Sequence, residues 1–131
     1  MLMRTAVAAA LLISLFVSSA HSACWRIENL RGHSAKAFDS YDITPDTLRG
    51  KIFRLAIEQG SASLSPNGGL SCTRVSSYTA ICAATDGAKA TAEVWSVDPV
   101  LRKAYQVHSR SGSGKFDGAA LFVGDIVGTC D

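Results

Sequence analysis

The chain that follows an N-terminal apolar segment contains four cysteines, two of which lie close to its ends. Cys24 lies just after that segment, Cys130 is the penultimate residue, and Cys72 and Cys82 lie between them. An even number of cysteines in a short exported chain indicates disulfides, which restrict a domain of this size strongly. We therefore predict a small domain that is held together by two bridges.

The apolar segment has the features of an export signal. Arg4 provides a positive charge, and the apolar run 6–17 is too short to span a bilayer as a permanent helix. Ala20 and Ser22 are small residues at the spacing that a signal peptidase recognises. The sequence therefore predicts cleavage after Ser22.

Cleavage there divides the chain into a signal peptide at 1–22 and a single secreted domain at 23–131. The alternative, lipidation of Cys24, would leave three cysteines and one unpaired thiol. The formal net charge is +2, and removal of Arg4 leaves +1 without any basic run, so nucleic acid is not an expected partner. We expect a periplasmic or secreted bacterial protein that is not integral to a membrane.

Hairpin geometry ranks the three possible pairings of the four cysteines. Cys72 and Cys82 are equidistant from Ser77, and the segments 70–75 and 79–84 on either side are typical of strands. In such a hairpin these two positions face each other directly, at a distance that suits a disulfide. We therefore predict this bridge, and the first and last cysteines then pair with one another.

Strand and turn signals alternate through the domain at intervals of roughly ten residues. In the segment 51–58, apolar residues alternate with polar ones, which predicts a half-buried strand with Phe53, Leu55 and Ile57 facing inward. Further strands are expected at 70–75, 79–84, 88–97, 100–109 and 119–127. Short strands with tight turns predict an all-β fold, a small antiparallel meander that closes into a barrel or a sandwich.

The segment 88–97 has larger residues on one face and small residues on the other. The first face carries Thr91, Glu93, Trp95 and Val97, and we expect the small face to pack inward. Trp95 would then lie exposed beside Glu93. A ring with a polar edge can contact a carbohydrate or a protein there, so Trp95 is a candidate partner-binding residue.

An acidic stretch precedes the strand at 51–58. The residues 44–46 have the order of a helix start, but Gly50 follows too soon for more than about one turn. Asp39, Asp42 and Asp46 could offer oxygens to Ca²⁺, yet they lack the spacing of an EF-hand loop. A solvated loop is the favoured interpretation, and no metal or cofactor is expected.

Some polar residues are of the types that hydrolases use. His33, Asp39, Asp42 and Ser109 include the members of a catalytic triad, but no G-x-S-x-G motif positions a nucleophile. Ordinary loop polarity is favoured over catalysis. A small hydrolase that uses His33 or His108 is kept as an alternative.

The loop at 109–118 is the strongest candidate for a functional site. It combines hydroxyl groups, two cations and an aromatic ring on a glycine-rich backbone, so it can reach into the cleft of a partner. The candidate partner-binding residues are Ser109, Arg110, Ser111, Gly112, Lys115 and Phe116.

This loop resembles the inhibitory loop of the periplasmic and membrane-bound inhibitors of c-type lysozyme. That family has a Ser-x-Ser-Gly motif shortly before an aromatic residue and a C-terminal half-cystine, which the segment 109–112, Phe116 and Cys130 match here. The resemblance covers about residues 78–130. The chain departs from the family after the loop, where 123–125 stand in place of a Trp-Lys-Gly stretch.

The resemblance implies a small exported barrel that inhibits without turnover. Ser111 would enter the cleft of a lysozyme and hydrogen-bond a catalytic carboxylate, and Lys115 or Arg110 would add charge complementarity. A binding or inhibitory protein that occludes a muramidase is therefore the main functional expectation. The alternatives are an immunity protein against a competitor's toxin, the small hydrolase, and an envelope structural protein without enzymatic activity.

Overall fold

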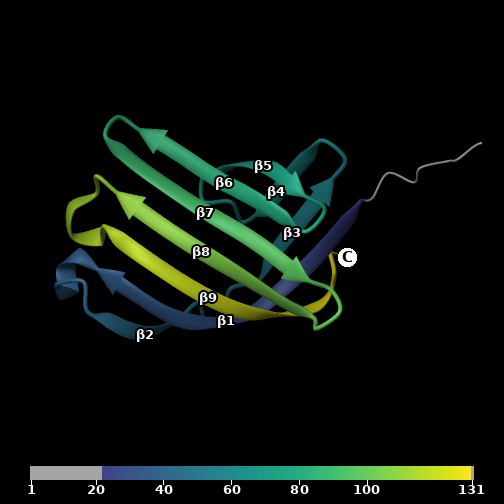
Figure 1. Cartoon of the computed structure of the whole chain (residues 1–131), viewed down its shortest axis with the longest axis horizontal. Coiled ribbons are helices and arrows are strands. Elements are labelled where there is room, and N and C mark those ends of the chain that lie inside the picture. The colour runs from purple at the N-terminus through teal and green to yellow at the C-terminus, as the bar shows by residue number, and fades with distance from the viewer. Residues whose placement is uncertain (1–21, 131) are drawn as a thin grey trace, which may run out of the picture.

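Residues 22–130, which the computed structural model describes, form one antiparallel sheet that curls into a nearly closed barrel (Figure 1). Residues 1–21 of the predicted signal peptide and Asp131 lie outside the described part. The strands and short 3-10 helices (η) are, in chain order, β1 (Ala23–Lys36), η1 (Ala37–Asp39), β2 (Ile43–Thr47), β3 (Phe53–Glu58), β4 (Ser61–Ser65), β5 (Ser71–Ser76), β6 (Thr79–Asp86), β7 (Lys89–Asp98), β8 (Lys103–Ser111), η2 (Gly114–Phe116) and β9 (Gly118–Thr129).

Neighbouring strands follow the order β4-β3-β1-β9-β8-β7-β6-β5, and β2 pairs with β1 beside this path. From β5 to β9 each strand pairs with the next one along the chain, which confirms the predicted meander. The first and last strands then pair along most of their length. The expected all-β fold is therefore confirmed, in its barrel-like form.

Both predicted disulfides are present. Cys72 and Cys82 are directly paired residues of the β5–β6 hairpin, and Cys24 is bonded to Cys130. The second bridge joins the start of β1 to the residue that follows β9. It lies at the opposite end of the sheet from the β8–β9 turn (Figure 1).

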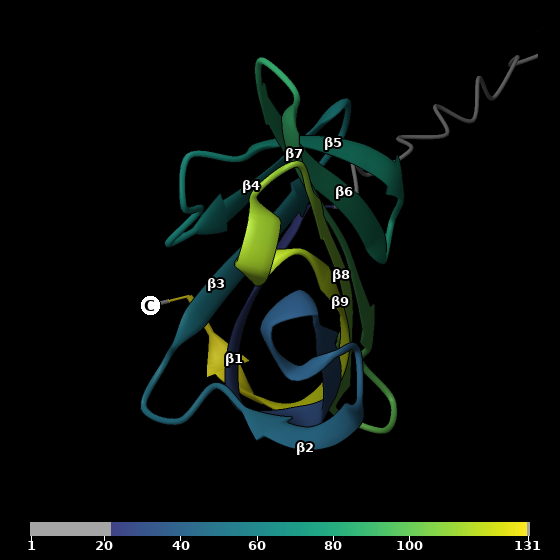
Figure 2. The same ribbon diagram turned by 90° about the vertical axis from the view of Figure 1, so that its left-hand side faces the viewer.

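The strand β1 changes partner halfway along its length. Residues 23–27 pair with β3, whereas residues 31–35 pair with the short β2. The register against β9 shifts around Asn29, whose φ is 59°. A bulge of this kind bends a strand, and the β3–β4 hairpin consequently covers only one end of the barrel. The curl of the sheet around this uneven interior is seen end-on in Figure 2.

The apolar core fills the end that β3 and β4 cover. Trp95 is fully buried and its ring packs against Phe53, with 4.9 Å between the ring centroids. The largest other side chains that are fully buried are Ile27, Leu30, Leu55 and Ile57. The predicted inward face of 51–58 is therefore confirmed. Aromatic pairs of this kind contribute about 0.5–1.5 kcal/mol beyond the area that they bury.

The expected orientation of the segment 88–97 is wrong. Glu93, Trp95 and Val97 are buried, whereas Ala92 and Val94 on the face of smaller residues are exposed. Trp95 is consequently a core residue that cannot contact a partner directly. The register decides this, because Trp95 is paired with neighbours on β6 and β8 that also face the interior.

Two local expectations also need correction. The segment 44–46 belongs to the strand β2 instead of a helical turn, and Pro45 is accommodated because β2 pairs only with β1 and is otherwise an edge strand. The strand expected at 100–109 begins only at Lys103. The carboxylate of Asp98 accepts hydrogen bonds from the amides of Val100 and Leu101, which holds these residues in a turn.

Candidate functional site

A cavity of about 520 Å³ lies inside the barrel, on the part of the sheet that the β3–β4 hairpin leaves uncovered. Its volume is within the range of small-molecule sites. One wall consists of inward residues from β7, β8 and β9, and the opposite side consists of residues from β2 and the segments 48–53 and 66–70. The lining residues used below are Lys36, Lys51, Thr91, Glu93, Gln106, His108, Arg110 and Ala120.

Directly paired residues of neighbouring strands point to the same face, so the inner wall is built in layers. From the η1–η2 end inward, the layers are Thr91, Arg110, Gly118 and Lys36; then Glu93, His108, Ala120 and Ser34; then Trp95, Gln106, Phe122 and Gly32. Charge therefore decreases with depth, and the cavity ends on the aromatic part of the core.

Small residues on β9 and β1 create the space. Gly118 separates the inward side chains of Arg110 and Lys36, and Ala120 separates those of His108 and Ser34. A large residue in place of Ala120, which lines the cavity, would fill it. The sheet is also tight here, since a Cβ atom on Gly118 would come within 1.9 Å of the Ala35 carbonyl oxygen.

Glu93 lies at the centre of the polar wall and is buried. Its Oε2 accepts a 2.7 Å hydrogen bond from Nε2 of Gln106 and lies 3.7 Å from Nδ1 of His108. Because an ionised carboxylate can only accept, the nitrogen of the Gln106 amide must be the atom that faces it. Gln106 Oε1 then remains buried without a hydrogen-bond partner among the described residues. Trp95 Nε1, a donor on the residue directly opposite Gln106, is likewise buried without a hydrogen-bond partner among these residues.

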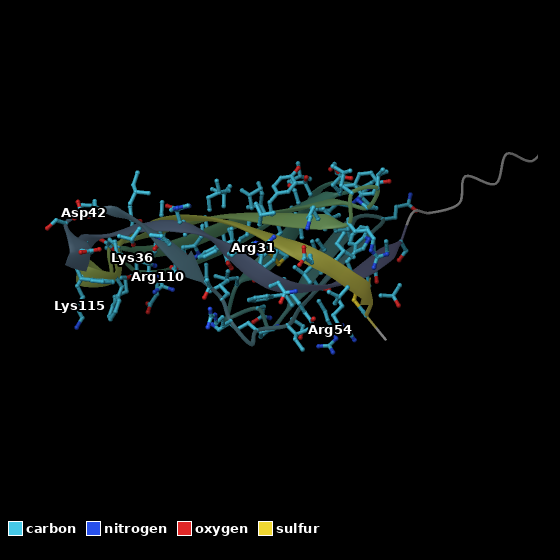
Figure 3. All side chains as sticks on the ribbon, turned by 90° about the horizontal axis from the view of Figure 1, so that it is seen from below. Arg31, Lys36, Asp42, Arg54, Arg110 and Lys115 are labelled. Carbon is cyan, nitrogen blue, oxygen red and sulfur yellow. A yellow bond between two sulfur atoms is a disulfide. The ribbon has the colours of Figure 1, made fainter. Side chains whose placement is uncertain are left out.

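Three cations contribute to the cavity. Lys36, Lys51 and Arg110 contribute to its lining, and within residues 22–130 none of the three forms an ion pair. Lys36 and Arg110 lie close together at the end of the molecule that also carries Lys115 (Figure 3). Asp46 also lines the cavity, but its pairing with Gly32 places it level with the third layer. The outer layer, which holds Lys36 and Arg110, is consequently positive, whereas the layer below it contains Glu93.

The residue types of a hydrolase triad, which the sequence analysis considered and did not favour, are not brought together. His33 and Ser109 are exposed, on the outer face of β1 and β8, whereas the neighbouring His108 faces the cavity. Asp39 and Asp42 are exposed at and just after η1. The structure instead places His108 next to Glu93, a pair that the sequence analysis did not predict.

The predicted loop 109–118 is shorter than expected, because β8 continues to Ser111. The turn that remains, residues 112–117, is called the hairpin loop below. Both oxygens of the Asp117 carboxylate accept backbone hydrogen bonds within it, at 3.1 Å from the Gly112 nitrogen and 2.6 Å from the Ser113 nitrogen. The Asp117 carbonyl also accepts a bond from the Ala37 amide at 2.8 Å. The loop is therefore fixed to η1.

The hairpin loop presents polar and aromatic groups to solvent. Lys115 and Phe116 are exposed, as is Ser111 at the adjoining end of β8, and Nζ of Lys115 lies 5.1 Å from the centroid of the Phe116 ring. Gly112 is required for this shape, since its φ is +75° and an added Cβ atom would lie 2.2 Å from the Ala88 carbonyl oxygen. Arg110 is the candidate loop residue that instead lines the cavity.

Sequence reasoning missed most of the cavity. Gln106, Thr91 and Lys36 were not singled out, and Glu93 was noted only as a neighbour of Trp95. The available signal was the run of polar residues at every second position in 106–110, next to a similar run in 91–93. That pattern was ambiguous because the outer face of the same strands is apolar. Ile81, Val94, Val107 and Leu121 form one exposed row across it.

Within residues 22–130 there is no cluster of three or more His, Cys, Asp or Glu side chains that could hold a metal ion. The described helices are too short and insufficiently apolar for any of them to cross a membrane. Two disulfides are compatible with an oxidising compartment. The chain matches no protein-family model, and no curated protein or solved structure is significantly similar to it.

Proposed function

We propose that this chain is an exported binding protein that takes a small polar molecule, or the polar end of a larger partner, into the inner cavity. The observation that carries the proposal is the buried network of Glu93, Gln106 and His108 on the wall of a cavity of about 520 Å³. Buried polar groups are costly unless they are satisfied, so their concentration beside open space indicates a ligand site.

Binding without turnover is the better interpretation of this site. A hydrolase with a catalytic serine needs that hydroxyl within hydrogen-bond reach of its base. The candidate Ser109 faces away from the cavity, and Glu93 already accepts a hydrogen bond from Gln106. These features favour recognition over catalysis.

Ligand-observed NMR with a panel of small molecules tests the proposal. The panel contains amino acids and short peptides, sugars, nucleotides, dicarboxylates and polyamines. Ala120→Phe fills the cavity, and Ala119→Phe places the same side chain on the exposed outer face of the same strand. We expect at least one class of these molecules to bind. Ala120→Phe should lower its affinity at least tenfold, whereas Ala119→Phe should leave it unchanged. Binding that is insensitive to Ala120→Phe in a folded variant would contradict the proposal.

The hairpin loop supports a second candidate function, the occlusion of a muramidase cleft. The observation that favours it is the local fixation of the loop by Asp117, since a partner-binding loop that is already ordered loses less entropy on docking. Ser111 and Lys115 would then provide the contacts that the family resemblance implies. A competitor's toxin is the alternative partner, with the chain acting as an immunity protein.

Inhibition assays separate this candidate from the first. We expect Ser111→Ala and Lys115→Ala to weaken inhibition of a responsive muramidase, and Ala120→Phe to leave it unchanged. A wild-type protein that inhibits none of several c-type lysozymes would remove the candidate.

A further inference from the structure

We infer that the ligand of the inner cavity is a zwitterion of about dipeptide size, with a free ammonium group held at Glu93 and a free carboxylate held at the outer layer. This inference rests on the proposed function, because it names the chemistry that the same cavity recognises. It follows from the order in which charges are arranged along the barrel.

The middle of the wall offers hydrogen-bond acceptors to a ligand. Glu93 Oε2 is occupied by Gln106, while the hydrogen bonds within residues 22–130 leave Glu93 Oε1 free. Gln106 Oε1 has no partner among the described residues. An ammonium group has three donors and the charge opposite to that of a carboxylate, so it suits this layer better than any neutral group.

The outer layer requires an anion. Lys36 and Arg110 are inward neighbours on either side of Gly118. A guanidinium binds a carboxylate through two parallel hydrogen bonds, and the Lys36 ammonium adds charge. Asp46 is paired with Gly32, two layers further in, so it does not neutralise this pair of cations.

Ligands with a single charge fit this order poorly. A simple anion would be repelled by Glu93 as it moved inward, and a simple cation bound at Glu93 would leave Lys36 and Arg110 without a counter-charge. A zwitterion that enters ammonium first meets a complementary charge at both depths.

The distance between the layers sets the size of the ligand. Glu93 and Thr91 are two residues apart on β7, so the two layers are separated by about 7 Å along the strand. A free α-amino acid is too short to engage both layers at once, whereas an extended dipeptide or an ω-amino acid is long enough. The cavity also has an apolar side, which includes Leu48, Ile52, Phe53 and Leu70 and can hold aliphatic side chains.

The test compares three closely related probes. Alanyl-leucine, its N-acetyl derivative and its C-terminal amide are titrated into the disulfide-bonded protein to about 20 mM, which reaches millimolar affinities. Chemical shifts of the His108 and Arg110 amides report binding. We expect saturable binding of alanyl-leucine and at least tenfold weaker binding of each derivative.

Substitutions in the wall assign the two ends of the ligand. In Glu93→Gln we expect N-acetylation to cost little further affinity, because the charge that it removes no longer has a partner. In Arg110→Gln the same should hold for the amide derivative. Lys89→Gln, on the exposed start of β7, is the control and should behave like the wild type.

Three outcomes would overturn the inference. Equal affinity for the free dipeptide and both derivatives would show that the protein recognises neither the ammonium group nor the carboxylate. Failure of alanyl-leucine to shift the cavity amides, while another class of the panel binds in an Ala120→Phe-sensitive manner, would reject the zwitterion and leave the proposed function intact. Failure of the whole panel would reject both.

Discussion

Gln106 donates a 2.7 Å hydrogen bond to Glu93 across the β7–β8 pair, and both side chains are buried inside the barrel. The two residues are diagonal neighbours, since the residue directly opposite Glu93 is His108. The Glu93 carboxylate is thus hydrogen-bonded by an amide and lies beside an imidazole, next to the apolar core that fills the other end of the barrel. This relationship identifies the part of the barrel interior that the β3–β4 hairpin leaves uncovered as the candidate site.

Removal of the donor should destabilise the protein. Gln106→Leu leaves the Glu93 carboxylate buried without its hydrogen bond, and we expect the free energy of unfolding to fall by about 1.5–3 kcal/mol in urea denaturation. The double variant Glu93→Leu/Gln106→Leu should recover part of this loss, because both polar groups are then absent. Gln59→Leu, in the exposed β3–β4 turn, serves as the control. Equal effects of Gln106→Leu and Gln59→Leu would contradict the network.

Close approach of β1 and β9 predicts a steric effect at Gly32. A Cβ atom there would lie 1.7 Å from the Leu121 carbonyl oxygen, so Gly32→Ala must displace one strand. We expect a loss of about 2–4 kcal/mol by thermal or urea unfolding. Gly60→Ala has nothing within 4 Å and is strained only by its φ of +81°, which should cost about 1 kcal/mol. A smaller effect at Gly32 than at Gly60 would argue against this pairing.

The two disulfides should differ in their contributions to stability. Cys24–Cys130 spans 106 residues and Cys72–Cys82 spans 10. In the chain-entropy model the first contributes about 4–5 kcal/mol and the second about 2.5–3 kcal/mol. Paired Cys→Ala variants measured by urea unfolding check the order. Greater loss on removal of the short bridge would show that strain or native packing outweighs chain entropy.

Asp117 should control the order of the hairpin loop. In Asp117→Ala the Gly112 and Ser113 amides lose their acceptor, and we expect lower NMR order parameters for residues 112–117 and a loss of about 1 kcal/mol in stability. Asp42→Ala, at an exposed position near η1, is the control. Removal of Cys24–Cys130 should leave the loop ordered, because that bridge lies at the other end of β9. A loop that is equally ordered in both Asp variants would contradict this assignment.

Acid should weaken the junction between β8, β9 and β1. Hydrogen bonds from Lys103 and Asn29 hold the pKa of the Asp125 carboxyl below its ordinary value. A lowered pKa in the folded state means that the contribution is complete above about pH 4, the unfolded value, and is lost as the pH falls through the folded value. We expect Asp125→Asn to be destabilised by about 1 kcal/mol or less at pH 7 and to lose less stability than the wild type on acidification. Parallel stability curves for both proteins would refute this.

The sequence by itself determined the covalent and local framework. The symmetry of Cys72 and Cys82 about Ser77 was enough to predict a hairpin with a bridge across it, and the remaining pair followed. The alternation in 51–58 predicted both a strand and its inward face. Such features depend on near neighbours in the chain, which a period of two residues reports directly.

Tertiary structure alone decided which face of the central strands became the interior. Ala92 and Val94 alternate with Glu93 and Trp95, so both faces of β7 offer apolar side chains and the pattern has no single solution. The choice is made by the register of β6, β8 and β9, whose inward rows close around Trp95. The same register brings Glu93, Gln106 and His108 together, and the small Ala120 beside His108 on β9 leaves space for the cavity. The four cysteines determined the positions of the two disulfides, whereas the pairing of distant strands determined which side chains the barrel encloses.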